Sequence, residues 1–298
     1  MKEGCAYWAA PDGTRLAVRS FPSGGSGPVV LMLHGIASHM GWYGGIAQEL
    51  QSRGVARSEG ARAHASAWGV LVDDAVHLAG MIERLHPGQP LHAMGISLGG
   101  AIVVASAILH PGLFRSLVLL SPALVSSVRV PLRLKLVTLT RAIISPSMLM
   151  NLPFGVEQLT TSPLWREVLA NDRHRTRQVS ARFLLELLRM QRFIRRHIRR
   201  VGEPVLAFFG ASDEIIDNDR SIMVLDSIQA ATVRVEVFEE TSHLLAASVP
   251  RRQLAQRLEI WLSGDHGSKS ERFSLLRTVL THPAGENDPP PSLADEGP

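Results

Sequence analysis

Apolar positions along the chain follow two different patterns. Five short runs are predominantly apolar and end at glycine or polar residues, which is typical of parallel strands buried in a sheet. These runs cover residues 29–33, 91–94, 116–120, 204–209 and 233–238. Segments with the spacing of amphipathic helices lie between and around them, at residues 42–51, 68–85, 98–109, 221–227 and 253–261. This alternation predicts an α/β fold with a mostly parallel central sheet and helices on both faces.

The two ends of the chain depart from this alternation. Residues 7–21 alternate between apolar and polar positions around Asp12-Gly13, which predicts a β-hairpin. After Ser263 the sequence becomes polar, and residues 285–291 read GENDPPP. We therefore expect residues 264–298 to form a polar, disordered tail.

Residues 124–202 interrupt the alternation of strands and helices. The segment is mostly helical in pattern, and prolines break it at positions 131, 146, 153 and 163. We expect a helical cap above the carboxyl ends of the strands, where parallel sheets bind ligands. The predicted organisation is therefore a first core part at 1–123, the cap at 124–202 and a second core part at 203–263.

Positive charge is concentrated in the cap. The chain has a net charge of +4, yet residues 124–203 hold 15 Arg and Lys side chains against five Asp and Glu. A solvated helical face explains most such segments. Two alternatives remain: the basic face of a helix around residues 183–194 could rest on an anionic membrane surface, or the arginines could meet nucleic acid. We expect no nucleic-acid binding, because aromatic side chains are few there and no known reader motif is present.

The cysteine content and the apolar runs of the sequence predict where the protein is located. Cys5 is the single cysteine, so no disulfide can form within the chain. The first residues lack the apolar core of a signal peptide, and no apolar run approaches the ~20 residues of a membrane span. The default expectation is a soluble, cytoplasmic protein.

A serine stands between two glycines where a predicted strand meets a predicted helix. The stretch reads Gly95-Ile96-Ser97-Leu98-Gly99. Gly-x-Ser-x-Gly in this context is typical of a nucleophile elbow, a sharp turn that lifts the serine hydroxyl above the sheet. Gly95 and Gly99 leave room for the turn and for close packing of the helix. An ordinary glycine-rich turn is the alternative.

A serine nucleophile needs a base and a carboxylate that orients the base. Asp213 follows the run 204–209, and His243 follows the run 233–238, in the chain order Ser, acid, His that such folds use. We expect both on the same rim of the sheet as Ser97. The competing carboxylates are Glu214, Asp217 and Asp219.

Acyl transfer also needs hydrogen-bond donors for the oxyanion. One expected donor is the backbone N–H of Leu98, the residue after the nucleophile. The other expected donor is a backbone N–H in the loop after residues 29–33, that of Ile36. We interpret His34 in this loop as structural.

The ordered set of motifs resembles the serine α/β-hydrolases of the monoacylglycerol lipase and lysophospholipase type. The matching pieces are LMLHGI (31–36), GISLGGA (95–101), LFRSLVLLSPAL (113–124), FFGASDEIID (208–217) and ETSHLL (240–245). The resemblance implies the α/β-hydrolase fold and hydrolysis of carboxylic esters of small lipid-like substrates through an acyl-enzyme, with no metal and no cofactor. It also implies that the cap forms the acyl-binding tunnel, which residues 132–154 could line; the alternative is that this stretch only forms the core of the cap.

One part of the chain departs from that family. The family has a strand and a glycine-rich turn before the helix at 68–85, but here only Val55-Ala56 is apolar between Gln51 and Ala61. We therefore expect one central strand to be missing, at a cost in stability because its neighbours lose ladder hydrogen bonds and buried surface. An impaired member of the family or an internal deletion in the sequence would explain it.

Other functions remain open at this point. A thioesterase, an acyltransferase or a C–C hydrolase would use the same fold, whereas a serine nucleophile argues against epoxide hydrolases and dehalogenases. From a different class, the chain could be a non-catalytic relative that binds a small apolar ligand. The expected missing strand favours that reading, and the three residues Ser97, Asp213 and His243 oppose it.

Overall fold

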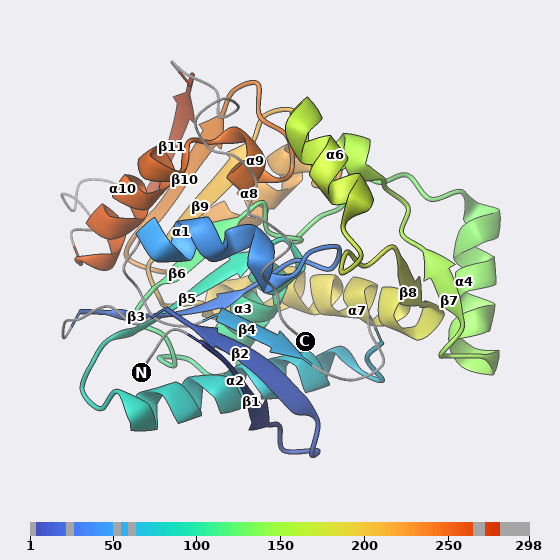
Figure 1. The fold of residues 1–298 in the computed structure, drawn as a ribbon, viewed down its shortest axis with the longest axis horizontal. Coiled ribbons are helices and arrows are strands. Elements are labelled where there is room, and N and C mark those ends of the chain that lie inside the picture. The colour runs from blue at the N-terminus through green and yellow to red at the C-terminus, as the bar shows by residue number, and fades with distance from the viewer. Residues whose placement is uncertain (1–3, 22–26, 50–54, 59–63, 265–271, 281–298) are drawn as a thin grey trace.

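The computed structural model describes residues 4–21, 27–49, 55–58, 64–264 and 272–280. Its core is a nine-stranded sheet with the strand order β1-β2-β4-β3-β5-β6-β9-β10-β11 (Figure 1). The strands are β1 (Gly4–Ala9), β2 (Arg15–Ser20), β3 (Val29–Leu33), β4 (Val55–Ser58), β5 (Leu91–Ile96), β6 (Leu117–Leu120), β9 (Val205–Gly210), β10 (Val233–Phe238) and β11 (Phe273–Thr278). β1 and β2 form the predicted antiparallel hairpin, and every neighbour pair from β4 to β11 is parallel. The mostly parallel sheet of the predicted α/β-hydrolase fold is confirmed.

Helices cover both faces of this sheet. Those outside the cap are η1 (Met40–Tyr43), α1 (Gly44–Glu49), α2 (Trp68–Leu85), α3 (Leu98–Leu109), α8 (Asn218–Asp226), α9 (Leu245–Ser248) and α10 (Arg251–Leu262). α1 packs against α10, and α2 packs against α3; the two pairs lie on opposite faces (Figure 1). The predicted bounds of α2 and α3 are those observed, whereas the last two residues of the predicted helix 42–51 lie outside the described residues.

Burial explains why the central strands were visible in the sequence. Every residue of β5, β6 and β9 is buried, because helices close both faces of the sheet at these strands. A strand buried on both sides needs apolar side chains at all positions, not at alternate ones. The continuous apolar runs therefore mark the centre of the sheet, whose carboxyl ends carry the candidate site.

The sheet contains the central strand that we expected to be missing. β4 lies between β2 and β3; it pairs antiparallel with β2 over four residue pairs and in parallel with β3 through Val55 and Ala56. The prediction was wrong because strand pairing uses backbone N–H and C=O groups, which every residue except proline supplies. A strand of four residues is also too short to show as an apolar run. The hairpin consequently joins the sheet through β4.

The predicted disordered tail contains a further strand. β11 (Phe273–Thr278) pairs in parallel with β10 over six residues, so the prediction for residues 264–298 was wrong for this part; residues 265–271 and 281–298 lie outside the described structure. Side chains reinforce the pairing, since Thr278 Oγ1 donates to Glu236 Oε1 at 2.5 Å and Arg277 Nη1 lies 2.9 Å from Glu239 Oε1. As an edge strand with half-exposed side chains, β11 has no apolar run to reveal it.

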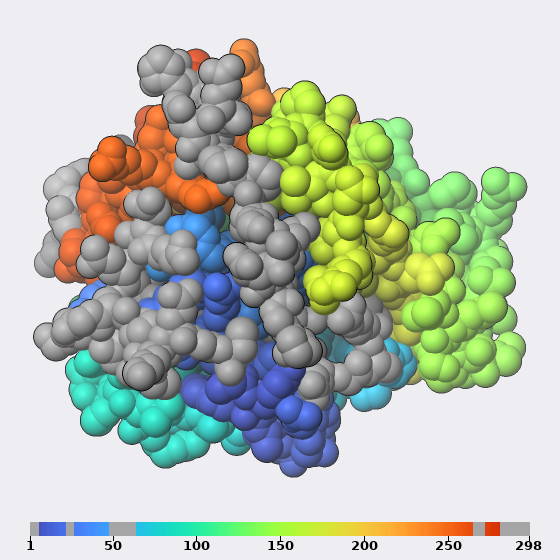
Figure 2. All heavy atoms as spheres, viewed as in Figure 1, coloured from blue at the N-terminus to red at the C-terminus, as the bar shows by residue number. Residues whose placement is uncertain are grey.

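The segment between β6 and β9 is mostly helical, as predicted. It comprises α4 (Leu132–Ile144), β7 (Leu149–Asn151), α5 (Val156–Leu159), α6 (Pro163–Asn171), β8 (Gln178–Ser180), α7 (Ala181–His197) and η2 (Ile198–Arg200). α7 packs on α3 and carries α4, and the small antiparallel pair β7–β8 was not predicted. Figure 2 shows α4 and its surroundings standing out as a lobe at one side of the molecule. Its helix has a single buried residue, Ala142.

A proline in β4 tests whether this strand is paired on both sides. Ala56→Pro removes an N–H from a strand between two neighbours, so we expect it to lower the free energy of unfolding by about 2 kcal/mol in urea denaturation. Ala56→Ser keeps the N–H and serves as the control, with a change within about 0.5 kcal/mol. Equal stability of the two variants would contradict the paired strand.

Candidate active site

Ser97 occupies a strained turn at the end of β5. Its backbone has φ 52° and ψ −112°, a region that residues with a Cβ rarely adopt. Neighbouring backbone fixes the turn: Ser97 N donates to Leu120 O, and Ala123 N donates to Ser97 O, both at 2.9 Å. A sharp strand-to-helix turn with this strain is the geometry of a nucleophile elbow.

The glycines beside Ser97 allow this turn because backbone segments pack against them directly. A Cβ on Gly95 would lie 2.5 Å from Gly100 Cα, and a Cβ on Gly99 would overlap the Leu33 carbonyl at the end of β3. Real Cβ atoms do not approach backbone so closely. The turn at Ser97 therefore leaves no room for a Cβ at either position.

The structure joins Asp213 and His243 directly. His243 Nδ1 lies 2.7 Å from Asp213 Oδ2, and the Asp213 side chain is fully buried. Asp213 Oδ1 accepts hydrogen bonds from the backbone N–H groups of Ile215 (2.8 Å) and Ile216 (2.9 Å). A carboxylate can only accept here, so Nδ1 carries the imidazole proton and Nε2 is left with its lone pair. That tautomer is the one a general base requires.

Ser97 and the Asp213–His243 pair share one rim of the sheet. β5, β6, β9 and β10 are consecutive neighbours, and the residues in question follow their carboxyl ends. Ser121, which follows β6, connects the two sides: its N donates to Phe208 O (2.8 Å) and its Oγ to His243 O (3.0 Å). The segment that holds the Ser97 backbone thus also holds the His243 loop. Sequence reasoning missed Ser121, whose only signal is its place directly after a buried strand.

The two expected oxyanion donors lie on either side of this turn. Leu98 is the first residue of α3. The loop that carries Ile36 passes beside the nucleophile, since a Cβ on Gly35 would lie 3.1 Å from Ser97 Cβ. The Gly35 carbonyl accepts from Ser38 Oγ at 3.0 Å and from Ser38 N at 3.3 Å. Because this carbonyl and the Ile36 N–H belong to one planar peptide unit, these bonds also fix the direction of the N–H.

A second buried His–Asp pair, which was not predicted, links this loop to the cap. His39 Nε2 lies 2.8 Å from Asp172 Oδ2, which also accepts from Trp42 Nε1 at 2.7 Å. Asp172 Oδ1 accepts from the N–H of His174 at 2.7 Å. His39 and Asp172 are 3% and 2% exposed. The loop behind the predicted oxyanion donor is therefore tied to the segment after α6.

The environment of Asp172 keeps its carboxylate ionised. Burial by itself raises the pKa, but the hydrogen bonds from His39 and Trp42, the charge of His39 and the N–H of His174 outweigh it and lower the pKa to about 2, from 3.8. Gly41 N lies 3.2 Å from His39 Nδ1, so both ring nitrogens of His39 have a partner.

The cap also touches the loop that carries His243. Leu244 N and Ser242 Oγ both donate to Leu159 O at the end of α5, at 2.7 and 3.3 Å. On the other side, Gln191 Nε2 of α7 donates to Ala123 O at 3.0 Å. The cap thus meets the rim on both sides of the elbow.

Metal sites and membrane spans were sought in the described part of the chain. Within it, no group of three or more His, Cys, Asp or Glu side chains is placed to hold a metal ion. No helix of that part is both long and apolar enough to cross a membrane.

Comparison with known proteins places these features in a family. A family model described as serine aminopeptidase, S33, matches residues 26–247. Human monoglyceride lipase is 24% identical over 87% of this chain and 86% of its own length, and the monoacylglycerol lipase of Mycolicibacterium smegmatis is 36% identical over 32% of this chain and 38% of its own. The crystal structure of a soluble variant of monoglyceride lipase from Saccharomyces cerevisiae superimposes with a TM-score of 0.77 at 16% identity, covering 90% of this chain and 97% of that one.

Replacing Asp172 tests the buried link to the cap. Because the pKa of Asp172 is lowered in the folded state, its ionised form stabilises the protein above the unfolded value near pH 4, and this stabilisation is lost as the pH falls towards 2. We expect Asp172→Asn to lower the free energy of unfolding by about 2 kcal/mol at pH 7, with a difference from the unmodified chain that shrinks below pH 4. Urea denaturation between pH 3 and 7 measures this.

Asp226→Asn is the control for that titration, because Asp226 forms an exposed ion pair with Arg272. Exposed pairs contribute about 0–1 kcal/mol, so this variant should stay close to the unmodified chain throughout. A pH-independent deficit in Asp172→Asn would contradict the role of the ionised carboxylate.

Proposed function

The chain belongs to the serine aminopeptidase S33 family of α/β-hydrolases, and on this premise we propose that this serine ester hydrolase cleaves carboxylic esters of lipid-like substrates through a triad of Ser97, His243 and Asp213. The observation that carries the proposal is the strained elbow at Ser97 on the same rim as the hydrogen-bonded Asp213–His243 pair. A serine at a strand-to-helix elbow and a buried carboxylate that holds an imidazole both have a use in acyl transfer.

In the proposed reaction the hydroxyl of Ser97 attacks the ester carbonyl carbon while Nε2 of His243 takes its proton. The backbone N–H groups of Ile36 and Leu98 stabilise the oxyanion. Collapse of the tetrahedral intermediate breaks the bond to the alcohol, which leaves with the proton from His243, and the acyl group stays on Ser97. Water then attacks this acyl-enzyme, with His243 again as base, and releases the acid. Asp213 holds the imidazole and stabilises its positive charge in both steps.

The lipid-like substrate class is the finer part of the proposal. Relatives named monoglyceride lipase and monoacylglycerol lipase support it. A peptide substrate is the competitor that the family description suggests, because the same triad cleaves amides. The argument for a non-catalytic relative was a missing central strand. The sheet contains that strand, β4, so this argument no longer applies.

We also propose that α4 contacts an anionic membrane surface. Leu132 and Ile143 are 71% and 70% exposed, and Leu136 and Leu139 are exposed with them. Arg133 and Lys135 lie on the same helix. Exposed apolar side chains beside basic ones are the pattern of interfacial helices. The sequence interpretation assigned this contact to the basic face of the helix at 183–194, which lies within α7; the exposed apolar side chains of α4 favour α4 instead. A cytoplasmic location stays a prediction.

Kinetics on p-nitrophenyl esters of increasing chain length test the reaction and the substrate class. We expect turnover to rise with chain length, no cleavage of aminoacyl p-nitroanilides, and a fall in kcat of at least about 10³-fold in Ser97→Ala and in Asp213→Asn. Glu214→Gln removes an exposed carboxylate from the same loop and should keep its activity. Loss of activity in Glu214→Gln but not in Asp213→Asn would overturn the assignment of the acid.

Flotation with phosphatidylserine-containing vesicles tests the membrane contact. The triple variant Leu132→Ser/Leu136→Ser/Ile143→Ser should reduce the bound fraction by about fivefold or more, because each substitution removes apolar surface from the interface. Met223→Ser/Ile260→Ser/Val279→Ser, at exposed apolar positions outside the cap, is the matched control. Equal losses in the two triple variants, or no flotation of the unmodified chain at low salt, would end this proposal.

A further inference from the structure

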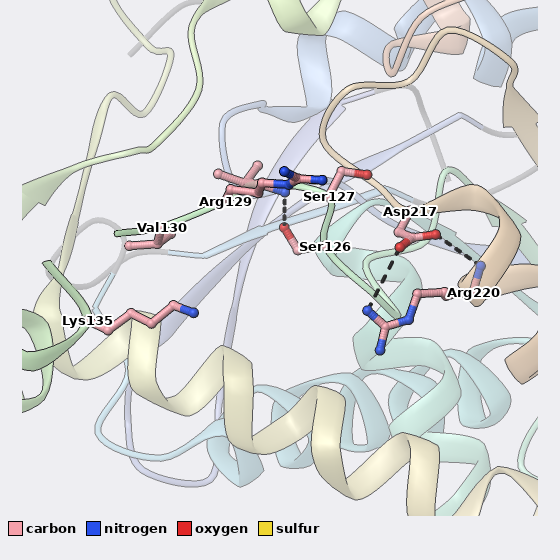
Figure 3. Close-up of a pocket in the computed structure, with 8 residues that line it drawn as sticks. Ser126, Ser127, Arg129, Val130, Lys135, Asp217 and Arg220 are labelled. Carbon is pink, nitrogen blue, oxygen red and sulfur yellow. Dashed lines mark hydrogen bonds and ion pairs between the residues drawn. The ribbon is translucent and has the colours of Figure 1, made fainter. Parts of the chain in front are cut away.

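A polar pocket of about 450 Å³ lies where the chain enters the cap, apart from the residues of the proposed triad. It is lined by Ser126, Ser127, Val128, Arg129, Val130, Lys135, Asp217 and Arg220. Three segments contribute: the connection from β6 to α4, the first turn of α4, and the start of α8. In Figure 3 the side chains of Lys135 and Arg220 point toward one another from opposite sides of the pocket.

The walls of this pocket are held together by backbone hydrogen bonds. Ser126 and Ile216 form an antiparallel bridge, and Ser127 N donates to Ile215 O at 2.9 Å. Asp217 N donates to Val125 O at 3.0 Å. One wall of the pocket therefore belongs to the loop whose backbone N–H groups, those of Ile215 and Ile216, donate to Asp213. Because these hydrogen bonds fix the backbone, the charged side chains of the pocket start from fixed positions.

The positive charge in the pocket exceeds the negative charge. Three cations face one carboxylate, Asp217, whose Oδ1 accepts from the N–H of Arg220 at 3.0 Å as the N-cap of α8. Its Oδ2 is 3.9 Å from Arg220 Nη1, a long ion pair. Among the described residues, Arg129 and Lys135 have no carboxylate within ion-pair distance.

Arg195, next to the pocket, lies in the same excess of positive charge. Arg195 of α7 donates through Nη1 to Leu124 O at 3.1 Å, directly before the pocket segment. Burial and then the positive charges of Arg220 and Arg192 lower the pKa of Arg195. Like charges crowd this part of the molecule without enough carboxylates to balance them.

We propose that this pocket binds a phosphate group, as a phosphomonoester either free in solution or in a lipid headgroup. Guanidinium groups match phosphate oxygens in a bidentate geometry, and Lys135 adds a point charge. The net charge of the lining, two positive, matches the dianion better than it matches a single carboxylate. The volume leaves room for a small organic group beside the phosphate. A bound phosphate would contact both the first turn of α4 and the start of α8, and would so link these two helices.

Titration calorimetry of the full chain with inorganic phosphate and with glycerol 3-phosphate, at constant ionic strength, is the first arm of the test. We expect saturable binding that weakens about tenfold or more in Arg129→Ala/Lys135→Ala. Asp217→Asn keeps an N-cap oxygen but removes the negative charge, so it should bind roughly threefold tighter. Arg196→Ala/Arg199→Ala, which removes the same charge from exposed positions outside the pocket, should stay within about twofold.

Cosedimentation with phosphatidylcholine vesicles that contain phosphatidic acid is the second arm, and it distinguishes the two sources of phosphate. Binding of the soluble phosphates with the expected order of variants supports a free phosphomonoester. Binding of the vesicles alone, with the same order of variants, supports a lipid headgroup. The proposal is overturned if neither probe binds, or if the control double variant weakens binding as much as the pocket double variant does. Thermal unfolding of each variant without phosphate establishes that it is folded, and because no arm measures hydrolysis, failure of the triad proposal leaves this test intact.

Discussion

The conformation of Ser97 is the constraint on which the arrangement of the site depends. A positive φ at a residue with a Cβ costs about 1–3 kcal/mol, and it persists here because the surrounding backbone leaves the turn no room to relax. Gly99 packs on the Leu33 carbonyl, and Gly95 packs on Gly100. Hydrogen bonds to Leu120 and from Ala123 hold both ends of the residue. The strained turn therefore locks β3, β5 and β6 together at their carboxyl ends, and each of these strands leads into a loop of the site.

The other parts of the site are fixed relative to this turn. The glycine at position 35 lets the loop after β3 pass beside Ser97, and the His39–Asp172 pair ties that loop to the cap. Ser121 follows β6 directly, and its hydroxyl donates a hydrogen bond to the His243 carbonyl, so the end of β6 holds the His243 loop. Asp213 is held by two backbone N–H groups and in turn holds His243. Few of these contacts reach solvent, so the rim is a set of coupled loops on a rigid sheet.

What the sequence could predict follows from which interactions leave a pattern in it. Strands buried on both faces must be apolar at nearly every position, so β5, β6 and β9 were visible. The ends of α2 and α3 could be placed because a Pro-Gly pair follows each helix. Glycine requirements are equally visible, because no other residue fits at Gly95 and Gly99. The chain order then placed Asp213 and His243 in neighbouring loops.

The features that were not predicted depend on interactions that leave no pattern in the sequence. β4 is a strand of four residues held by backbone hydrogen bonds, which any residue can make. β11 lies at the edge of the sheet with half-exposed side chains, so its sequence, FSLLRT, mixes apolar and polar residues and shows no buried run. The His39–Asp172 contact joins residues separated by 133 positions, and a single aspartate in a basic segment gives no sign of its partner. Very short strands, edge strands and isolated polar contacts therefore leave no pattern from which they could be predicted.

Fluorophosphonate labelling followed by peptide mapping tests the central claim most directly. The reagent phosphonylates a serine only when its hydroxyl is activated in a folded site, and it makes no assumption about the substrate. The account predicts a single adduct on the peptide that contains Ser97, its loss on heat denaturation, and slow labelling in Asp213→Asn. A folded protein that takes no label, or an adduct on a different serine, would contradict a site built around the elbow.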